Sequence, residues 1–221
     1  MSRHHVFVTG ATGYIGRALV PALLARGHHV RMLVRPGSER RAPAGAQCVR
    51  GDALQAGSYR DLVAPADTFV HLVGTPHPAP WKGQAFRAVD LVSIRSAVEA
   101  ARYARVQHFI YLSVAQPAPV MAAYIAVRQE GEGLLERSGL RATIVRPWYV
   151  LGPGHYWPLL VVPIYRLLER LPSTRDMAMR LGLVRLEQLV SALVDAVERP
   201  AAAPRTIGVP EMRTLAGRLA A

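Results

Sequence analysis

Short apolar runs alternate with stretches of helical periodicity along most of this chain. The runs that predict buried strands cover residues 6–9, 29–34, 46–50, 68–73, 108–112 and 141–146, with a last short strand at 206–209. The helical stretches cover residues 18–26, 58–63, 86–105, 121–138, 186–198 and 211–219. Strands that alternate with helices at this spacing predict right-handed crossovers and a parallel sheet buried on both faces. We therefore expect an α/β, doubly wound fold with a mostly parallel sheet and helices on both faces.

The pattern changes after the segment 152–154, which reads GPG. Residues 157–171 are apolar and helix-like, but Pro158 and Pro163 interrupt them, and a polar turn follows at 172–176. This tail is too short to form an independent second domain. We expect a single domain over residues 1–221, in which residues 155–185 form a short C-terminal cap over the substrate side.

Three glycines spaced three apart follow the first strand and precede the first helix. In the segment 9–16 (TGATGYIG), Gly10 allows a tight turn, Gly13 lets backbone approach a pyrophosphate, and Gly16 lets the helix pack close to the strand. The free N–H groups at the helix start then face the phosphates. Strand, glycine turn and helix in this order predict a nucleotide site of the Rossmann type. The alternative is a glycine-rich turn that binds nothing.

The composition is that of a folded protein that attracts anionic ligands. Of the 221 residues 51% are hydrophobic, and the formal net charge is +12. Nearly all of the basic residues are arginines, with Lys82 the only lysine, and they are scattered without forming a tract or a nucleic-acid motif. We expect this charge to favour a phosphorylated cofactor, and we expect no specific nucleic-acid binding.

No segment of the chain is typical of export or of a membrane span. The first strand begins at His5 or Val6, which leaves no room for a signal peptide, and no apolar run reaches the roughly 18 residues of a span. The single cysteine, Cys48, excludes an internal disulfide and is expected to pack near a strand without acting as a nucleophile. A cytoplasmic protein without a metal site is the expectation that follows.

Further motifs, in matching order, resemble the short-chain dehydrogenase/reductase superfamily. The glycine segment is followed by Gly-Asp-Ala-Leu at 51–54, VHLVG at 70–74, YLS at 111–113, TIVRP at 143–147 and GPG at 152–154. Tyr124 and Arg128 stand where the superfamily has its Tyr-x-x-x-Lys pair. The resemblance covers residues 5–200 and points to the atypical and extended branches, with their NAD(P)H-binding, epimerase-like and NmrA-like proteins.

The resemblance implies a nicotinamide dinucleotide, and the end of the second strand favours NADP over NAD. NAD-preferring sites carry an acidic residue there for the ribose 2′-OH, whereas this chain has Arg35, whose guanidinium suits a 2′-phosphate. Two alternatives stay open: Arg35 is a solvated loop residue, and Asp52 caps a turn. The residues that the resemblance places at the cofactor are Gly10, Thr12, Gly13, Tyr14, Ile15, Gly16, Arg35, Asp52, Ala53, Val73, Gly74, Thr75, Arg128, Pro147 and Val150.

The resemblance also implies a catalytic set of Tyr124, Arg128 and Ser113. In active members the tyrosine is the general acid/base, a lysine four residues later lowers its pKa and holds the nicotinamide ribose, and a serine binds the substrate oxygen. Residues four apart share one helix face, so Tyr124 and Arg128 can face the cofactor together. Arg128 keeps the positive charge of lysine but is bulkier, planar and hard to deprotonate. The structural alternative is that Arg128 pairs with Glu132 while Tyr124 packs beside it.

On the substrate side, the resemblance places residues 146–150 near the nicotinamide and His155, Tyr156 and Trp157 in a roof over the substrate. The roof and the stretch after it are rich in Leu, Val, Tyr and Trp, which suggests an apolar or aromatic substrate. Ordinary core packing of a cap helix is the alternative. A third interpretation is peripheral contact with a membrane or another subunit, through the basic and apolar residues 166–170.

Two functions fit these expectations. The first is an NADP-dependent oxidoreductase or epimerase-like enzyme acting on a small, apolar substrate, which the retained Tyr124 and the apolar roof favour. The second is a non-catalytic NADP-binding redox sensor or accessory subunit, which Arg128 and the short cap favour. His71 and His155 add titratable groups near the site, but each is expected to be structural. We expect a monomer or a homodimer, since helices corresponding to 86–105 and 121–138 often pair between subunits in this superfamily.

Overall fold

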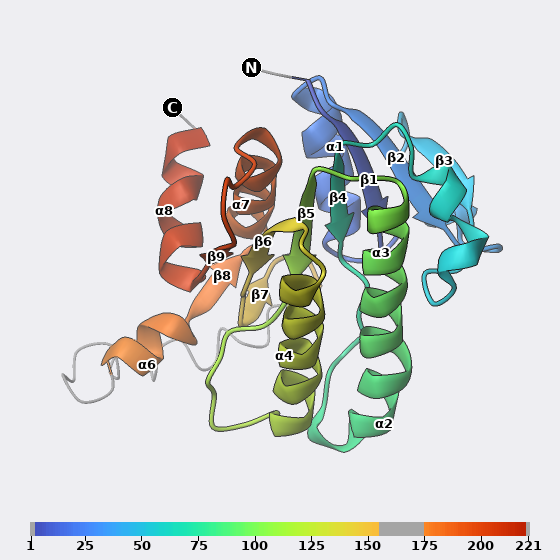
Figure 1. Ribbon diagram of the computed structural model, residues 1–221. Helices are drawn as coiled ribbons and strands as arrows, with labels where there is room; N and C mark the ends of the chain where they lie inside the picture. The colour runs from blue at the N-terminus through green and yellow to red at the C-terminus, as the bar shows by residue number, and fades with distance from the viewer. Residues whose placement is uncertain (1–2, 155–174, 220–221) are drawn as a thin grey trace.

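Seven parallel strands form the central sheet of the protein. The computed structural model describes residues 3–154 and 175–219. Within them the strand order is β3-β2-β1-β4-β5-β6-β9, and every neighbouring pair is parallel (Figure 1). This order is that of a doubly wound Rossmann sheet and confirms the predicted fold class. The strands are β1 (His5–Thr9), β2 (His29–Val34), β3 (Gln47–Arg50), β4 (Thr68–His71), β5 (His108–Leu112), β6 (Arg141–Val145) and β9 (Arg205–Ile207).

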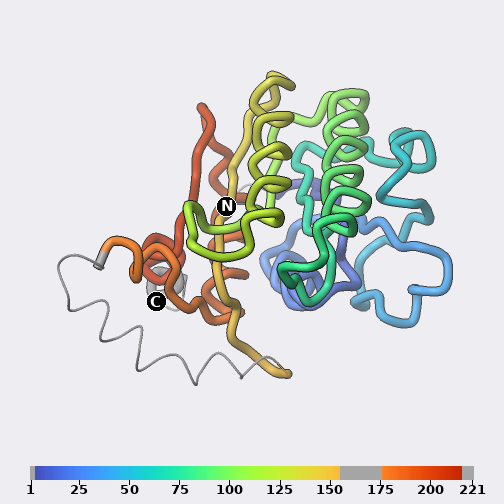
Figure 2. Tube along the Cα trace, turned by 90° about the horizontal axis from the view of Figure 1, so that it is seen from below, coloured from blue at the N-terminus to red at the C-terminus, as the bar shows by residue number. Residues whose placement is uncertain are grey.

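Helices cover both faces of the sheet. Helices α3 and α4 lie on one face, and α1 and α7 lie on the other (Figure 2). Each face has its own apolar cluster: Ile94 and Leu135 lie on the face of α3 and α4, and Leu19, Leu23 and Leu193 lie on the face of α1 and α7. Burial of apolar side chains on both faces is what a parallel sheet requires. The longer helices are α1 (Gly16–Ala25), α3 (Val92–Tyr103), α4 (Ala122–Arg137), α7 (Leu186–Glu198) and α8 (Val209–Leu219).

A second, two-stranded sheet was not predicted from the sequence. Strands β7 (Tyr149–Leu151) and β8 (Leu183–Arg185) pair in parallel. Each strand has only three residues, too few to show an alternation of apolar and polar positions. Most of the predicted cap at 155–185 lies outside the described residues. Its described part consists of α6 (Arg175–Arg180) and β8.

The predicted helices at 58–63 and 86–105 are wrong in detail. The first is replaced by two short 3-10 turns, Ala56–Ser58 and Arg60–Leu62, and Tyr59 between them, at φ −147° and ψ −7°, lies outside the helical region. The second begins with the short α2 (Gly83–Ala85) and a π-helical turn, Phe86–Leu91, before α3 starts. The wider π turn buries both Phe86 and Asp90.

Cys48 differs from its expectation as well. It was expected to pack near a strand, but it lies within β3 and its side chain is exposed. Two further 3-10 turns lie in loops, at Glu39–Arg41 and Pro80–Lys82. No helix in the described part of the chain has the length and apolar content needed to cross a membrane.

The parallel arrangement brings the carboxyl ends of all the central strands to one edge of the sheet. The glycine turn follows β1 at this edge, Leu72 to Thr75 follow β4, Ser113 follows β5 and Arg146 follows β6. Ligands of open α/β sheets bind outside this edge, next to the point where the strand order reverses. Here that point lies between β1 and β4, so the fold places the glycine turn at the expected site.

Candidate cofactor and catalytic site

A pocket of about 480 Å³ opens at the carboxyl edge beside the glycine turn. It combines residues from the ends of β1, β2, β3 and β4, which lie far apart in the sequence. Eight of the residues predicted to hold the cofactor line it: Gly10, Thr12, Gly13, Arg35, Asp52, Ala53, Val73 and Gly74. The eight residues, which were predicted from the sequence to share one site, therefore line one pocket of the folded protein.

The glycine turn fits a pyrophosphate. Gly10 has a φ of +79°, and a Cβ there would lie 2.8 Å from the carbonyl carbon of Leu72. A Cβ on Gly16 would lie 2.5 Å from Ala11 Cα. A Cβ on Gly13 would meet only the Gly10 carbonyl oxygen, at 3.2 Å, and Gly13 is exposed in the pocket wall. Packing therefore requires Gly10 and Gly16, whereas Gly13 leaves space for a ligand.

Two arginines stand at the far end of this pocket. Arg35 follows β2, and the 3-10 turn Glu39–Arg41 brings Arg41 to the same wall. Both side chains are exposed, and Arg41 donates to the Ser38 hydroxyl at 3.1 Å. Asp52 lines the pocket too, while its Oδ1 accepts a hydrogen bond from the Leu54 N–H at 2.9 Å. Asp52 thus caps a local turn and still faces the ligand space.

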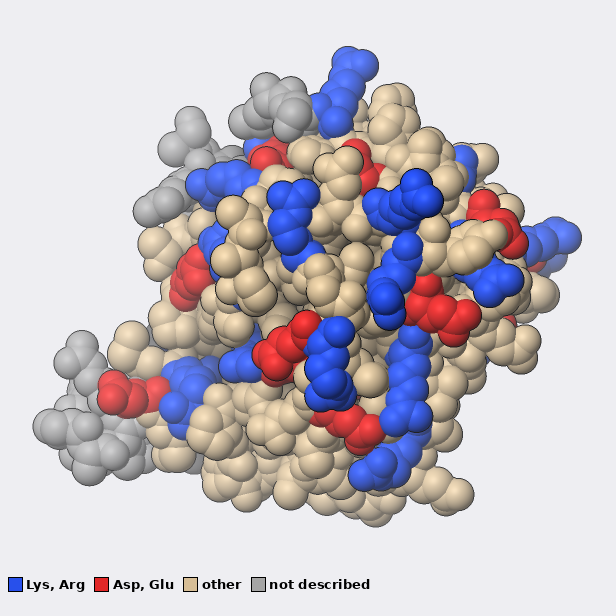
Figure 3. All heavy atoms as spheres, in the orientation of Figure 1, with Lys and Arg blue, Asp and Glu red and all other residues tan. Residues whose placement is uncertain are grey.

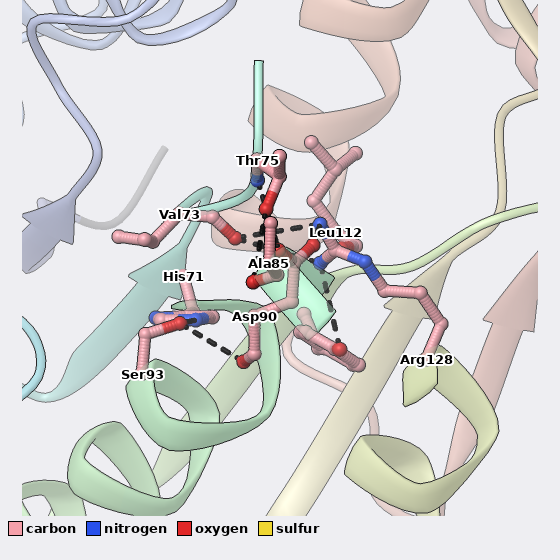
Figure 4. Close-up of polar contacts among 9 residues, drawn as sticks. His71, Val73, Thr75, Ala85, Asp90, Ser93, Leu112 and Arg128 are labelled. Atoms are coloured by element: carbon pink, nitrogen blue, oxygen red, sulfur yellow. Dashed lines mark hydrogen bonds and ion pairs between the residues drawn. The ribbon is translucent and has the colours of Figure 1, made fainter. Parts of the chain in front are cut away.

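Arg128 is buried in an ion pair with Asp90. Its Nη2 lies 2.6 Å from Asp90 Oδ1, and its Nη1 donates to the Leu112 carbonyl oxygen at 2.9 Å. The other carboxylate oxygen of Asp90 accepts from the backbone N–H and the hydroxyl of Thr75, at 2.9 and 2.6 Å. Figure 4 shows Asp90 between Thr75 and the guanidinium of Arg128. The expected pair with Glu132 is therefore wrong, because Arg128 uses a carboxylate from the π turn instead.

Gly74 and two aromatic rings enclose the same guanidinium. A Cβ on Gly74 would collide with Arg128 Nη2. The guanidinium carbon lies 5.1 Å from the ring centre of Tyr124 and 5.7 Å from that of Tyr111. Burial alone would lower the pKa of Arg128, but the interactions with Tyr124, Tyr111 and Asp90 outweigh it and raise that pKa. Arg128 is a permanent charge beneath the pocket wall, with the Tyr124 ring beside it, as the structural alternative expected.

Tyr124 lies near the start of α4. Its side chain is half-buried, and its ring packs against Phe86 of the π turn at a centroid distance of 4.9 Å. The ring is thus fixed between Phe86 and Arg128, one turn further along the helix.

A second buried carboxylate, Glu132, engages Ser113. The Ser113 hydroxyl donates to Glu132 Oε1 at 2.5 Å, and Gln116 donates to both carboxylate oxygens at 3.0 Å. Arg146 binds the same group in a bidentate manner, at 3.0 and 2.5 Å. Only 6% of the Glu132 side chain is exposed. The Ser113 proton is therefore directed into the protein.

The remaining predicted cofactor residues lie outside the lining of the 480 Å³ pocket. Pro147 is buried, and its carbonyl oxygen accepts from the Ala115 N–H at 2.8 Å. Val150 pairs with Val184 in the small sheet. A Cβ on Gly152 would collide with the Tyr14 hydroxyl, so the glycine turn contacts the chain just after β7.

His71 is a core residue, as expected. Burial, with a further contribution from the charge of Arg128, lowers the pKa of His71 to about 3. The neutral ring is bonded through Nδ1 to the Thr9 hydroxyl at 2.8 Å and through Nε2 to the Ser93 hydroxyl at 3.2 Å. The predicted substrate residues His155, Tyr156 and Trp157 and the segment 166–170 lie outside the described residues. The described ranges contain no cluster of side chains suited to a metal ion.

Comparison with known proteins connects this geometry with nicotinamide cofactors. The family model described as NAD(P)H-binding matches residues 10–153. Ceramide reductase of Caulobacter vibrioides is 30% identical over 203 residues, which are 90% of this chain and 62% of that protein. A Streptomyces 3-diazoavenalumate denitrifying reductase is 30% identical over an alignment that covers 97% of this chain and 85% of the relative.

A solved structure shares the fold. The Bordetella bronchiseptica enzyme WbmH, in complex with NAD⁺, superposes with a TM-score of 0.69 at 21% identity, covering 94% of this chain and 76% of that one. The family description and the NAD⁺ bound by this neighbour both associate the fold with a nicotinamide dinucleotide.

Proposed function

Because the chain belongs to the NAD(P)H-binding family of atypical, epimerase-like short-chain dehydrogenases/reductases, we propose that it is an NADP-dependent reductase of a small, apolar carbonyl compound. The observation that carries this proposal is the pocket in which the glycine turn and Asp52 meet two guanidinium groups. We propose that the residues predicted from the sequence to contact the cofactor do so, except that Arg128 acts through charge and positioning.

The preference for NADP rests on the two arginines at the far end of the pocket. A 2′-phosphate is a dianionic group that guanidinium groups bind through paired hydrogen bonds. Arg35 and Arg41 both line the space where the adenosine ribose belongs in this fold. Asp52, which also lines the pocket, accepts a hydrogen bond from the Leu54 N–H and is suited to the adenine. The pocket is thus built to favour the additional phosphate.

In the proposed reaction, Tyr124 donates a proton to the carbonyl oxygen of the substrate. The bound cofactor supplies the hydride for the carbonyl carbon. A positive charge close to a phenol stabilises the phenolate that remains after the proton leaves, and the Arg128 guanidinium carbon lies 5.1 Å from the Tyr124 ring centre. We assign Arg128 as a positioning and charge residue, since Gly74 and Asp90 enclose the guanidinium. Ser113 is assigned to holding the loop after β5 through Glu132.

The proposed substrate is apolar because of the chain's relatives and its sequence. Ceramide reductase, which is 30% identical to this chain, is named for a lipid substrate. Residues 155–171, which follow β7 in the sequence, are predominantly Leu, Val, Tyr, Trp and Pro. This chain spans 62% of the length of ceramide reductase, so the activity of the whole relative enters here as a proposal only.

A second candidate is an NADP-binding protein without turnover, such as a redox sensor or accessory subunit. Two observations favour it: Arg128 is committed to Asp90, and the Ser113 hydroxyl is committed to Glu132. Neither side chain is then free to make the ribose and substrate contacts expected from the resemblance. Under either candidate we propose a cytoplasmic protein that is a monomer or a homodimer. Light scattering after size exclusion would distinguish the two oligomeric states.

The deciding experiment measures NADPH oxidation with a panel of apolar ketones and aldehydes. We expect turnover by the wild type, and its loss by at least 100-fold in Tyr124→Phe, which keeps the ring packing but lacks the proton. Binding of NADPH should change less than threefold in this variant. Tight NADPH binding by the wild type, with no oxidation of NADPH by any compound, would favour the non-catalytic candidate.

A further inference from the structure

Two large apolar side chains project into solvent at the same edge of the molecule. Trp81 is 83% exposed and Val120 is 52% exposed. Their loops meet, because a Cβ on Gly83 would lie 3.6 Å from Ala123 Cβ in the first turn of α4. The two loops, residues 76–82 and 117–123, form what we call the Trp81 edge.

The Trp81 edge borders the cofactor pocket. Pro76, the first residue of the edge, lines that pocket. Lys82 closes the loop, since its Nζ donates to the carbonyl oxygens of Pro76 and His77 at 2.9 Å each. The loop between them is thereby tied back on itself, and Trp81 points outward, into solvent. Exposed apolar side chains that gather at one edge and are rimmed by polar residues mark an interaction site.

The charge near this edge is basic on balance. No aspartate or glutamate occurs in residues 68–89 or 100–129, which include both loops. Lys82 lies within the edge, and nearby Arg87 and Arg95 share a single carboxylate, Glu130, at 3.5 and 2.9 Å. In Figure 3 the lower rim is mostly uncharged, and the Lys and Arg side chains above it are interspersed with Asp and Glu. The edge therefore presents apolar groups and a basic surround.

We propose that the Trp81 edge docks this protein on the surface of an anionic phospholipid bilayer. Tryptophan favours the boundary between headgroups and acyl chains, and basic side chains are attracted to anionic headgroups. A second copy of the chain fits less well, because two apolar side chains cannot bury the roughly 1,200 Å² of a stable protein interface. Docking would bring Tyr124, the residue that directly follows the edge in the sequence, close to a source of apolar molecules. That use rests on the proposed function, whereas the docking does not.

Vesicle sedimentation of the full chain tests this proposal. The probes are vesicles of phosphatidylcholine alone and vesicles containing one-third phosphatidylglycerol. We expect the wild type to bind the anionic vesicles at least tenfold more tightly than the neutral ones. The double variant Trp81→Ala/Val120→Ser should lose at least tenfold in affinity for the anionic vesicles. The matched control is Tyr103→Ala, since Tyr103 is 57% exposed on α3 and lies outside the edge.

Several outcomes would overturn the docking proposal. One is that the wild type does not sediment with the vesicles. Another is that the double variant and Tyr103→Ala lose equal affinity for the vesicles. A third is that the wild type is a dimer and the double variant is a monomer. NADPH affinity measured on the same preparations separates this proposal from the enzymatic one. A double variant that binds NADPH like the wild type but not the vesicles supports docking. If the wild type binds vesicles but not NADPH, the proposed function is contradicted and the docking proposal is supported.

Discussion

Arg128 of α4 and Asp90 of the π turn form an ion pair at 2.6 Å, with only 4% and 0% of their side chains exposed. The pair connects three parts of the carboxyl edge, because Asp90 also binds Thr75 and Arg128 also binds the Leu112 carbonyl oxygen. A positive residue at the position of the superfamily's lysine is here used to hold the strand ends in place. Its influence on Tyr124 is then exerted through charge and packing.

Breaking this pair should destabilise the fold. Arg128→Met leaves the Asp90 carboxylate buried without its cation, and we expect the free energy of unfolding to fall by about 3–5 kcal/mol. Urea denaturation followed by circular dichroism measures the loss. The control is Arg87→Met, which removes a pair with Glu130 in which 66% of the arginine side chain is exposed and should cost less than about 1 kcal/mol. Equal losses of unfolding free energy in the two variants would show that the buried pair contributes no more to stability than the exposed one.

Two glycines of the same turn should respond differently to alanine. Gly16→Ala places a Cβ 2.5 Å from Ala11 Cα, so we expect a loss of stability of about 2 kcal/mol or more. Gly13→Ala meets only one oxygen, at 3.2 Å, on the pocket side, so stability should change little while NADPH affinity falls at least tenfold. Thermal unfolding and fluorescence titration measure the two effects. Unchanged NADPH affinity in Gly13→Ala would show that the pyrophosphate does not bind at this turn.

Ser113 should act on stability more than on chemistry. Ser113→Ala removes a donor from the buried Glu132 carboxylate, and we expect the free energy of unfolding to fall by about 1–3 kcal/mol. Turnover should fall less than tenfold, far less than in Tyr124→Phe. If Ser113→Ala abolished turnover with no loss of stability, the hydroxyl would have to reach the substrate directly.

The buried histidines make stability depend on pH. The pKa of His71 is lowered to about 3 and that of His108 to about 4, mainly by burial, whereas an unfolded histidine has a pKa of about 6.5. Between these values the unfolded chain binds more protons, so this stability is fully present above pH 6.5 and is lost as the pH falls. Each histidine should contribute a slope of at most about 1.4 kcal/mol per pH unit. His71→Gln should flatten the slope between pH 6.5 and 5, as urea denaturation across that range would measure.

Local pattern predicted most of the fold. The buried central strands are marked by apolar runs, and the glycine turn by its spacing, because both depend on residues adjacent in the sequence. The strands β7 and β8 escaped prediction because three residues carry no periodicity, and their pairing joins segments about thirty residues apart. The π turn escaped because its sequence has the apolar spacing of an ordinary helix.

The partners of the site residues were harder to predict than the residues themselves. The sequence offers Glu132 to Arg128 at the favourable i,i+4 spacing, and nothing in it indicates Asp90, 38 residues away. Glu132 is instead taken by Ser113 and Arg146, which the ends of β5 and β6 bring to it. These choices depend on which strand ends lie side by side, and that is a property of the assembled sheet. Arg41 reaches the pocket for a similar reason, through a 3-10 turn in a polar loop.

The most direct test of the central claim is a calorimetric titration of the wild type with NADPH and with NADH. The arginines at the far end of the pocket predict at least tenfold tighter binding of NADPH. This preference should disappear in Arg35→Ala/Arg41→Ala, with the affinity for NADH unchanged. Equal affinities of the wild type for the two dinucleotides, or a preference for NADH, would contradict the account.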